Sequence, residues 1–412
     1  MGKINKWSRA VKIVGLSSFF LNCSSLIVFS YFAVYLKKEL HISFSQLGFL
    51  DGCVDFLSYV MRFLSGFASD LIVNRKLFFL IGITLVVLAK PLEAIFRTFL
   101  PMFATKIMER IGNGIQATPR DALISDYSDE VSPAKRAEYF GIRQAMGSMG
   151  SLVGSILACV LFWYFQDFQT VFWCSVPVGL IAVLITAFCV KNKYNKSILY
   201  GLQKEKQNTE SILTTKKQKF KLSDIKQFNR EYWILLGITS IYFIAKVSDS
   251  MALLYAIGSR DIPIYFIPLF FVVFHIGAVL ASYISGLMRG RIKQIENLFL
   301  IGIAGFIVAL ILFIWYNTSM ISILLGMALL GAYSGLANGM FPSCVSNLLP
   351  EKLRGTGHGI YNVTSAISLL LGGSILGIVS DKYDQRTGLC MSCVLALISM
   401  LVLLIYKKKK YV

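Results

Sequence analysis

Long apolar stretches recur along this chain from Val11 almost to the C-terminus, and they limit its fold more than any other feature. A helix needs about 20 mostly apolar residues to cross the hydrocarbon core of a bilayer. Backbone polar groups inside lipid must be bonded within the protein, which helices achieve. The sequence therefore predicts an all-α, multi-pass membrane protein. We expect twelve transmembrane helices, at residues 11–36, 43–71, 77–98, 102–125, 138–164, 168–190, 232–257, 263–288, 297–316, 320–348, 356–380 and 387–406.

The positions of the basic residues explain the formal net charge of +19 better than binding to nucleic acid does, so no nucleic-acid partner is expected. Lys and Arg gather before the first span, in every second loop and after the last span. The intervening loops carry only six, namely Lys37, Lys38, Arg97, Arg260, Lys382 and Arg386. Because cytoplasmic loops are enriched in Lys and Arg, both termini are expected in the cytoplasm.

The composition changes abruptly between the sixth and seventh spans, where residues 191–230 carry eleven Lys and Arg. We interpret this segment as a basic cytoplasmic linker between two six-helix halves, at residues 1–190 and 231–412. An internal repeat supports the division, since PAKRAEYFGI follows the fourth span and PEKLRGTGHGI follows the tenth. In each, an arginine precedes a Gly-Ile pair by five residues. Such repeats are typical of secondary transporters.

Three local motifs carry a resemblance to a known family. GFASDLIVNRK follows the second span, ERIGNGIQATPRDAL lies in the fourth, and Asp126 stands at the end of the fourth. With twelve spans and the repeat, the chain resembles the bacterial members of the major facilitator superfamily of secondary transporters. The resemblance implies two pseudo-symmetric six-helix halves and a multi-pass protein of the bacterial inner membrane. We expect it to act as a monomer.

The resemblance also implies a cytoplasmic gate formed by Gly66, Asp70, Arg75 and Asp126. Asp70 would accept hydrogen bonds from the start of the eleventh helix, because a helix N-terminus favours an anion. Arg75 would pair with Asp126 at the same level. Ordinary loop chemistry on the positively charged side of the membrane is the alternative for both.

Charged residues within the spans are candidates for a solute pathway. In the second span, Asp51, Asp55, Ser58, Arg62 and Ser65 fall on one helical face, because successive residues are about 100° apart around the axis. An ionisable side chain at membrane depth costs at least a few kcal/mol unless it meets a partner or water. This face is therefore expected to line a wet central path that is open towards the cytoplasm.

Charges in other spans extend this path. We predict that it is lined by Asp51, Asp55, Arg62, Glu109, Arg110, Arg143, Lys246 and Asp249. The alternative is that such charges only pair with one another and fix helix positions, as Glu93 with Arg97, Lys90 with Glu93 or Arg120 with Asp121.

The favoured function is secondary active transport of a small polar or charged organic solute by alternating access. Protons, or another ion, would be coupled to it in symport, with Asp51 and Asp55 competing for one proton near Arg62. The alternatives are a drug or metabolite efflux pump, or a non-transporting receptor or assembly factor on a transporter fold. No histidine–carboxylate group occurs at helical spacing, so neither an enzyme nor a metal or cofactor site is expected. The solute, the direction of transport, the coupling ion, the choice among symport, antiport and uniport, and the oligomeric state stay open at this point.

Overall fold

The computed structural model describes residues 2–72, 74–127, 133–191, 228–258, 262–288, 295–315, 319–349 and 354–411, with the side chains of most of them. The first six long helices are α1 (Gly2–Lys38), α2 (Phe44–Ile72), α3 (Arg75–Ile95), α4 (Phe99–Tyr127), α5 (Pro133–Phe165) and α6 (Phe168–Leu184). A π-helical turn, η1 (Ile185–Cys189), continues α6.

The remaining helices begin beyond the linker expected at 191–230, most of which lies outside the described residues. They are α9 (Arg230–Ala245), α10 (Asp249–Ile257), the 3-10 turn η3 (Ile264–Phe266), α11 (Ile267–Met288), α12 (Ile295–Trp315), α13 (Met320–Leu348), α14 (Arg354–Lys382) and α15 (Gln385–Tyr411). Eleven of the twelve predicted spans each coincide with one continuous helical stretch and the seventh with the pair α9 and α10, so the predicted all-α fold is confirmed.

The seventh predicted span is broken, contrary to the expected continuous helix at 232–257. The helix α9 ends at Ala245, and α10 begins at Asp249 after a short extended segment. The side chain of Ser248 accepts a hydrogen bond from the Met251 amide at 3.2 Å, which caps the start of α10. Serine is a strong helix N-cap, and Asp249 in the first turn complements the helix dipole. The sequence thus carries a helix start within an apolar stretch.

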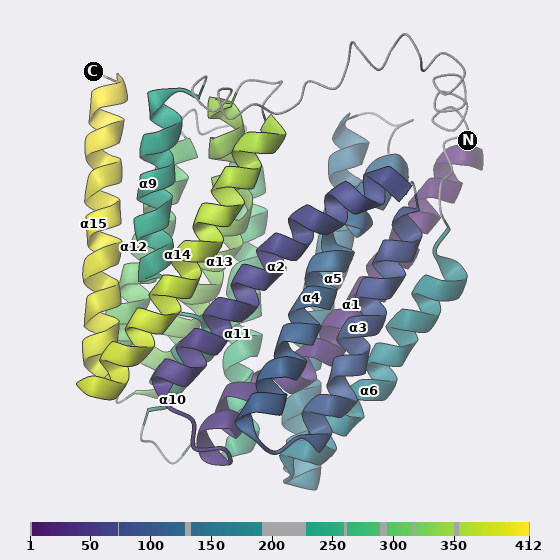
Figure 1. Cartoon of the computed structure of the whole chain (residues 1–412), viewed down its shortest axis with the longest axis horizontal. Coiled ribbons are helices and arrows are strands. Elements are labelled where there is room, and N and C mark those ends of the chain that lie inside the picture. The colour runs from purple at the N-terminus through teal and green to yellow at the C-terminus, as the bar shows by residue number, and fades with distance from the viewer. Residues whose placement is uncertain are drawn as a thin grey trace.

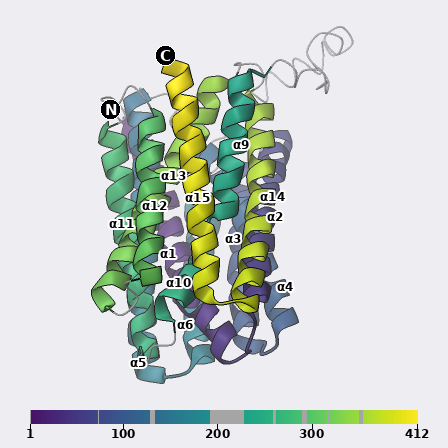
Figure 2. The ribbon, with the colours of Figure 1, turned by 90° about the vertical axis from the view of Figure 1, so that its left-hand side faces the viewer.

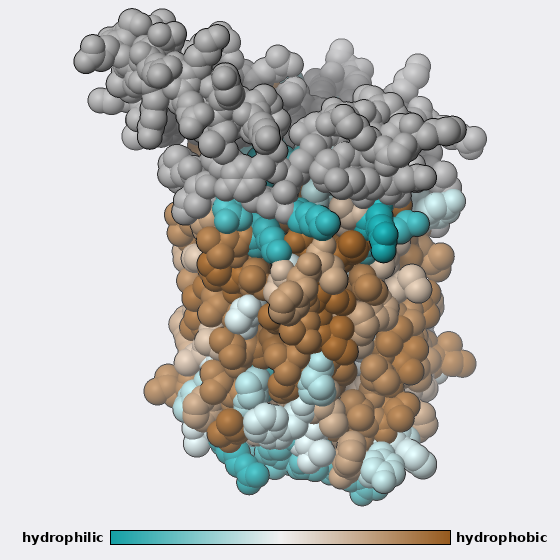
Figure 3. Space-filling model, turned by 90° about the vertical axis from the view of Figure 1, so that its right-hand side faces the viewer, coloured by the Kyte–Doolittle hydropathy of each residue, from teal (hydrophilic) through white to brown (hydrophobic). Residues whose placement is uncertain are grey.

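Eight segments in the described part of the chain are long and apolar enough to cross a membrane by length and composition alone. The helices α2 and α4 are not among them, because both carry several charged residues inside the span. The face of the molecule shown in Figure 3 nevertheless carries a broad apolar band between more hydrophilic ends. The charges of α2 and α4 must therefore be accommodated inside the bundle.

The helices α1–α6 pack against one another, as do α9–α15, and the two sets meet chiefly where α2 packs on α14 and α5 on α11 (Figures 1 and 2). The contact between α2 and α14 is very close at the end away from the chain termini. A Cβ atom added at Gly48 would clash with the carbonyl oxygen of Gly373, and one at Gly377 with that of Phe44. These glycines let the two backbones touch, as small residues do in membrane interiors.

Both ends of the chain lie at the same end of the bundle, at the top of Figure 1. This arrangement agrees with the even number of spans. The cytoplasmic position of that end stays a prediction from the distribution of Lys and Arg.

Candidate functional site

Five charged side chains meet at the boundary between the two helix sets, and we call them the central cluster: Asp51, Asp55, Arg110, Lys246 and Asp249. Asp51 and Asp55 come from α2 and Arg110 from α4, whereas Lys246 and Asp249 flank the break between α9 and α10. The Arg110 guanidinium interacts electrostatically with all three carboxylates, and the Lys246 ammonium with Asp249 and Asp55. All five side chains are half-buried. The structure therefore brings together five of the eight predicted pathway residues.

The groups of the central cluster are near one another but are not paired. Among the described residues, none of the five forms an ion pair with a nitrogen–oxygen distance of 4.0 Å or less. The Nε atom of Arg110 is buried and donates no hydrogen bond within the described part of the chain. Buried polar groups of folded proteins are nearly always bonded. The free Nε–H of Arg110 is therefore a donor available to a ligand or to water.

Asp51 connects the two helix sets directly. Its carboxylate accepts hydrogen bonds from the hydroxyls of Ser248, at 2.7 Å, and Ser250, at 3.4 Å. Ser248 caps the start of α10 and Ser250 lies in its first turn, so the broken helix supplies hydroxyl donors to α2. The sequence did not single out these serines. The helix N-cap pattern around Ser248 is the feature of the sequence that could have indicated them.

Four further charges form a separate group between α3 and α4, which we call the buried quartet: Lys90, Glu93, Lys106 and Glu109. Lys90 Nζ lies 3.3 Å from Glu93 Oε2 and 2.7 Å from Glu109 Oε1. Lys106 Nζ lies 3.1 Å from Glu93 Oε1 and 2.6 Å from Glu109 Oε2. The predicted pairing of Lys90 with Glu93 is confirmed. Glu109, predicted on the pathway, is 5% exposed and held by two lysines, so the structure places it in this group instead.

Arg62 lies away from the central cluster. Its side chain is exposed, and its guanidinium carbon lies 5.5 Å from the centre of the Tyr59 ring. Ser58 and Ser65, on the same predicted face, are buried, and the Ser65 hydroxyl donates to the Gly114 carbonyl of α4 at 3.1 Å. The polar face of α2 is therefore divided, because its serines pack on α4 whereas Asp51 and Asp55 face the α9–α10 break. Arg110 is the arginine found to interact with both aspartates.

Arg143, the eighth predicted pathway residue, belongs to a third group near the end of the bundle that holds the termini. Its Nε atom lies 3.7 Å from Asp121 Oδ1, and the same carboxylate oxygen accepts from Arg120 at 3.1 Å. The predicted pairing of Arg120 with Asp121 is thus confirmed. Arg143 extends that pair from α4 to α5 and is not part of the central cluster.

Part of the predicted cytoplasmic gate can be described. Arg75 forms an ion pair with Asp126 and also donates to the Ala122 carbonyl at 2.9 Å, which ties the start of α3 to the end of α4. This confirms the predicted pairing of Arg75 with Asp126. The surroundings of Gly66 and the side chain of Asp70 lie outside the described residues, so their place in the gate stays a prediction.

An aspartate at the opposite end of the bundle makes a contact between α14 and α2 that was not predicted from the sequence. Asp381, near the end of α14, accepts hydrogen bonds from the backbone N–H groups of Phe44 and Ser45 at 2.8 and 2.7 Å. It also accepts from the Ser45 hydroxyl at 2.6 Å. An anion is favoured at a helix N-terminus, here that of α2. The contact joins the two helix sets at the end remote from the termini.

A sequence signal for this contact exists. GFASDLIVNR at 66–75 and GIVSDKYDQR at 377–386 share the glycine, the Ser-Asp pair, an amide residue and the arginine in the same register. The first segment lies at one end of α2, and the second at the opposite end of α14. The chain therefore carries the same motif at both ends of the α2–α14 contact.

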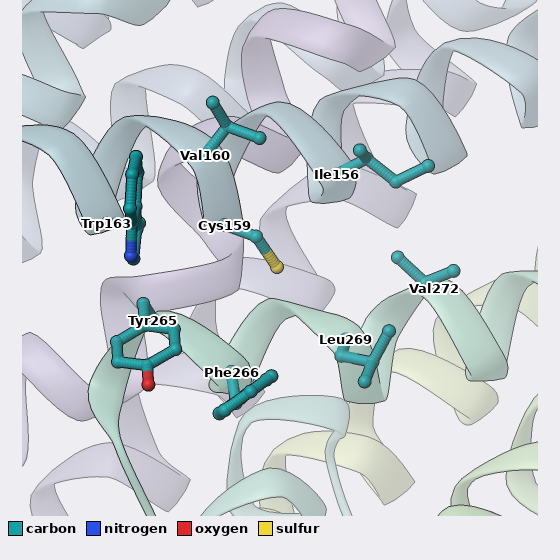
Figure 4. Close-up of a pocket in the computed structure, with 8 residues that line it drawn as sticks. All are labelled: Ile156, Cys159, Val160, Trp163, Tyr265, Phe266, Leu269 and Val272. Carbon is teal, nitrogen blue, oxygen red and sulfur yellow. The ribbon is translucent and has the colours of Figure 1, made fainter.

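A pocket opens between α5 and the η3–α11 segment (Figure 4). Its volume is about 360 Å³, and it is lined by Ile156, Cys159, Val160, Trp163, Tyr265, Phe266, Leu269 and Val272. No charged side chain lines it, so it offers nothing to hold a polar solute by charge. Within the described residues, no group of three or more His, Cys, Asp or Glu side chains is placed to bind a metal ion.

A bundle of long apolar helices with a charged interior shared between two helix sets defines a membrane transport protein. The family model described as Major Facilitator Superfamily matches residues 14–373, and the chain belongs to this superfamily. It is therefore a membrane transporter of that kind.

Two further comparisons agree. An uncharacterised MFS-type transporter of Methanocaldococcus jannaschii is 26% identical over 403 residues, covering 96% of this chain and 94% of the relative. The crystal structure of the nucleoside transporter NupG superposes with a TM-score of 0.72 at 15% identity, covering 97% and 98% of the two chains. A POT family transporter in complex with a thioalcohol-conjugated peptide gives a TM-score of 0.73 at 14% identity, covering 97% and 96%. These two structures show the shared fold.

Proposed function

We propose that this protein is a secondary active transporter that moves a small polar or charged organic solute by alternating access, in symport with protons. One observation carries the proposal, namely that the central cluster is unpaired and is contributed by both helix sets. Charged groups at membrane depth are costly without partners. Their retention is explained by a pathway in which water, solute and ions complete their coordination.

Alternating access needs contacts that hold one end closed and then release. In this structure the end remote from the termini is closed by the Asp381 contact with α2 and by the glycine contacts between α2 and α14. For the other end we assign the matching role to Asp70, together with the ion pair of Arg75 with Asp126. We assign the end with the termini to the cytoplasm of a bacterial cell and take the monomer as the working unit.

Proton coupling is supported by the charge balance of the central cluster. Three carboxylates face two cations, which leaves one formal negative charge that a proton can neutralise. Asp51 is already bonded to two serine hydroxyls. Asp55 makes no hydrogen bond through its side chain to other described residues and interacts with both cations. Asp51 and Asp55 are therefore the two candidate carriers of the coupled proton, and Asp55 is the one that has no hydrogen bond to the described residues to lose.

The test uses the full chain in proteoliposomes with a transported solute found by a binding screen. Asp55→Asn is expected to abolish proton-driven accumulation of the solute. The matched control is Glu39→Gln, because Glu39 is exposed in the loop between α1 and α2. Undiminished accumulation by Asp55→Asn would reject Asp55 as the proton carrier.

Transport itself is tested by access to the cluster. The thiol of an Asp249→Cys variant is expected to react with membrane-impermeant reagents added on one side of the membrane under some conditions, and with reagents added on the other side under other conditions. Protection from both sides under all conditions would indicate a sealed, non-transporting protein.

A further inference from the structure

The two charge clusters differ in what they leave available to a ligand. In the buried quartet each lysine contacts both glutamates within 3.3 Å, and the four charges cancel. Each charge of this group already has two neighbours of opposite sign, and the group as a whole carries no net charge. Any charge recognition of a solute must therefore come from the central cluster.

Within the central cluster, four groups remain after the bonds already described are counted. Asp51 is occupied by Ser248 and Ser250. Asp55 and Asp249 on one side, and Arg110 and Lys246 on the other, make no side-chain hydrogen bond and no close ion pair among the described residues. Two anionic and two cationic groups, none of them hydrogen-bonded or closely ion-paired within the described part of the chain, thus lie near one another in the central cluster.

We propose that the solute is a zwitterion with a carboxylate and a protonated amine. Arg110 and Lys246 bind its carboxylate, and Asp55 and Asp249 bind its ammonium group. Guanidinium binds a carboxylate through two parallel hydrogen bonds, and an ammonium group donates three. This inference rests on the proposed transport function and specifies its substrate class.

A solute with a single charge fits the cluster less well. An amine alone would leave Arg110 and Lys246 without an anion, and a carboxylate alone would leave Asp55 and Asp249 without a cation. Removing one partner of a charge pair from a poorly hydrated site leaves the other charge uncompensated, which is costly. Only a solute that carries both an ammonium and a carboxylate group provides a partner for the two carboxylates and for the two cations.

The origin of the four groups links binding to movement. Arg110 and Asp55 belong to the first helix set, whereas Lys246 and Asp249 belong to the second. Each end of a bound zwitterion therefore contacts one residue from each set. Occupancy draws the two sets together around the solute, which a singly charged ligand would do at one end only.

The experiment is a thermal-unfolding series on the purified full chain, because a ligand that binds only the folded protein raises its apparent stability. The probes are glycine, β-alanine, 4-aminobutanoate, 5-aminopentanoate and 6-aminohexanoate, which vary the separation of the two charges. Each is compared with the alkylamine and the alkyl carboxylate of matched length. At least one zwitterion is expected to raise Tm by several degrees at a concentration at which its matched amine and carboxylate have no effect.

Variants test the assigned residues. Arg110→Gln and Asp249→Asn are expected to remove the zwitterion-dependent rise in Tm, and Arg110→Lys to keep part of it. The matched controls are Arg97→Gln and Glu39→Gln, which remove the same charges from exposed loops. If Arg110→Gln fails to yield folded protein, Lys246→Gln provides the same test from the second helix set.

Failure of this inference is distinguishable from failure of the proposed function. Uridine and glucose serve as uncharged probes in the same series and in proteoliposome uptake. Uptake of either, with no response to any zwitterion, overturns the substrate class and leaves transport standing. Equal responses to a zwitterion and its singly charged counterparts also overturn it, as does an undiminished response in Arg110→Gln.

Discussion

The buried quartet and the central cluster contain similar residues, but their charged groups are stabilised within the membrane in opposite ways. In the quartet, every charged group has two partners within 3.3 Å, and both helices come from the first helix set. In the central cluster the groups interact over longer distances and come from both sets. Close pairing within one set suits a fixed structural element, whereas open charges across a boundary suit a binding site. Ionisable residues inside a membrane therefore differ in role according to their partners.

This comparison predicts the largest loss of stability from the quartet. Lys90→Met leaves Glu93 and Glu109 with one lysine between them. Breaking a buried ion pair by removing one partner costs about 3–5 kcal/mol, so Tm and expression are expected to fall sharply. The measurement is reversible denaturation of the purified protein. The double variant Lys90→Met with Glu93→Gln restores charge balance and is expected to recover part of the loss.

Recovery by the double variant is the decisive part of this test. If it is no more stable than Lys90→Met alone, charge balance is not what the quartet supplies.

The central cluster is expected to show the reverse pattern. Asp55→Asn removes no close ion pair, so its free energy of unfolding is expected to change by less than about 1 kcal/mol, the scale of one net hydrogen bond. Solute accumulation driven by a proton gradient is expected to fall at least about 100-fold, a loss of about 2.7 kcal/mol in a rate. Denaturation and proteoliposome uptake measure the two quantities on one preparation. A loss of stability as large as that of Lys90→Met would remove the distinction between the clusters.

A smaller effect is expected from the contact at the closed end. Asp381→Asn replaces the carboxylate at the N-terminus of α2 by a neutral amide. The interaction of an anion with a helix N-terminus contributes about 0.3–1 kcal/mol at an exposed site. That corresponds to a shift of up to about fivefold towards the open state.

A Leu47→Cys variant reports this opening, because Leu47 is buried beside the contact at 1% exposure. Labelling by an impermeant reagent is expected to rise in the Asp381→Asn background and to stay low with Asp384→Asn, an exposed neighbour in the next loop. Equal labelling in the two backgrounds would show that Asp381 does not hold this end closed.

The smallest effect is expected from Ser248→Ala, which removes the 2.7 Å hydrogen bond to Asp51 and leaves the weaker one from Ser250. A single hydrogen bond contributes about 0.5–1.5 kcal/mol net, so the apparent affinity for the solute is expected to change by a few-fold. Ser240→Ala is the control, since Ser240 bonds only within α9, to the Leu236 carbonyl. An effect of Ser248→Ala on coupling as large as that of Asp55→Asn would move the proton-carrying role to Asp51.

Several features of the site followed from local pattern. The pair of Lys90 with Glu93 was predicted because residues one turn apart on a helix are neighbours, and the pair of Arg120 with Asp121 was also expected. The third expected pair, Glu93 with Arg97, is not formed among the described residues, because α3 ends at Ile95 and Glu93 binds Lys90 and Lys106. The charge content of α2 marked Asp51 and Asp55 as interior residues. The Asp381 contact could have been found from the repeat of GFASDLIVNR in GIVSDKYDQR.

Other features could not be predicted in this way. Sequence spacing does not give the distance between helices that are far apart along the chain. It therefore placed Glu109 on the pathway, although both lysines of the quartet bind it. It also favoured Arg62 as the partner of the aspartates, although Arg110 from α4 takes that place.

The sequence by itself determined the class of protein, the number of spans and the set of interior charges. Hydrocarbon thickness sets the length of each span, and the cost of unbonded backbone requires helices, so these properties depend only on local composition. The tertiary structure decided which charges close into pairs and which remain open. That outcome depends on packing between helices, where a shift of a few ångströms separates a satisfied ion pair from a free binding group.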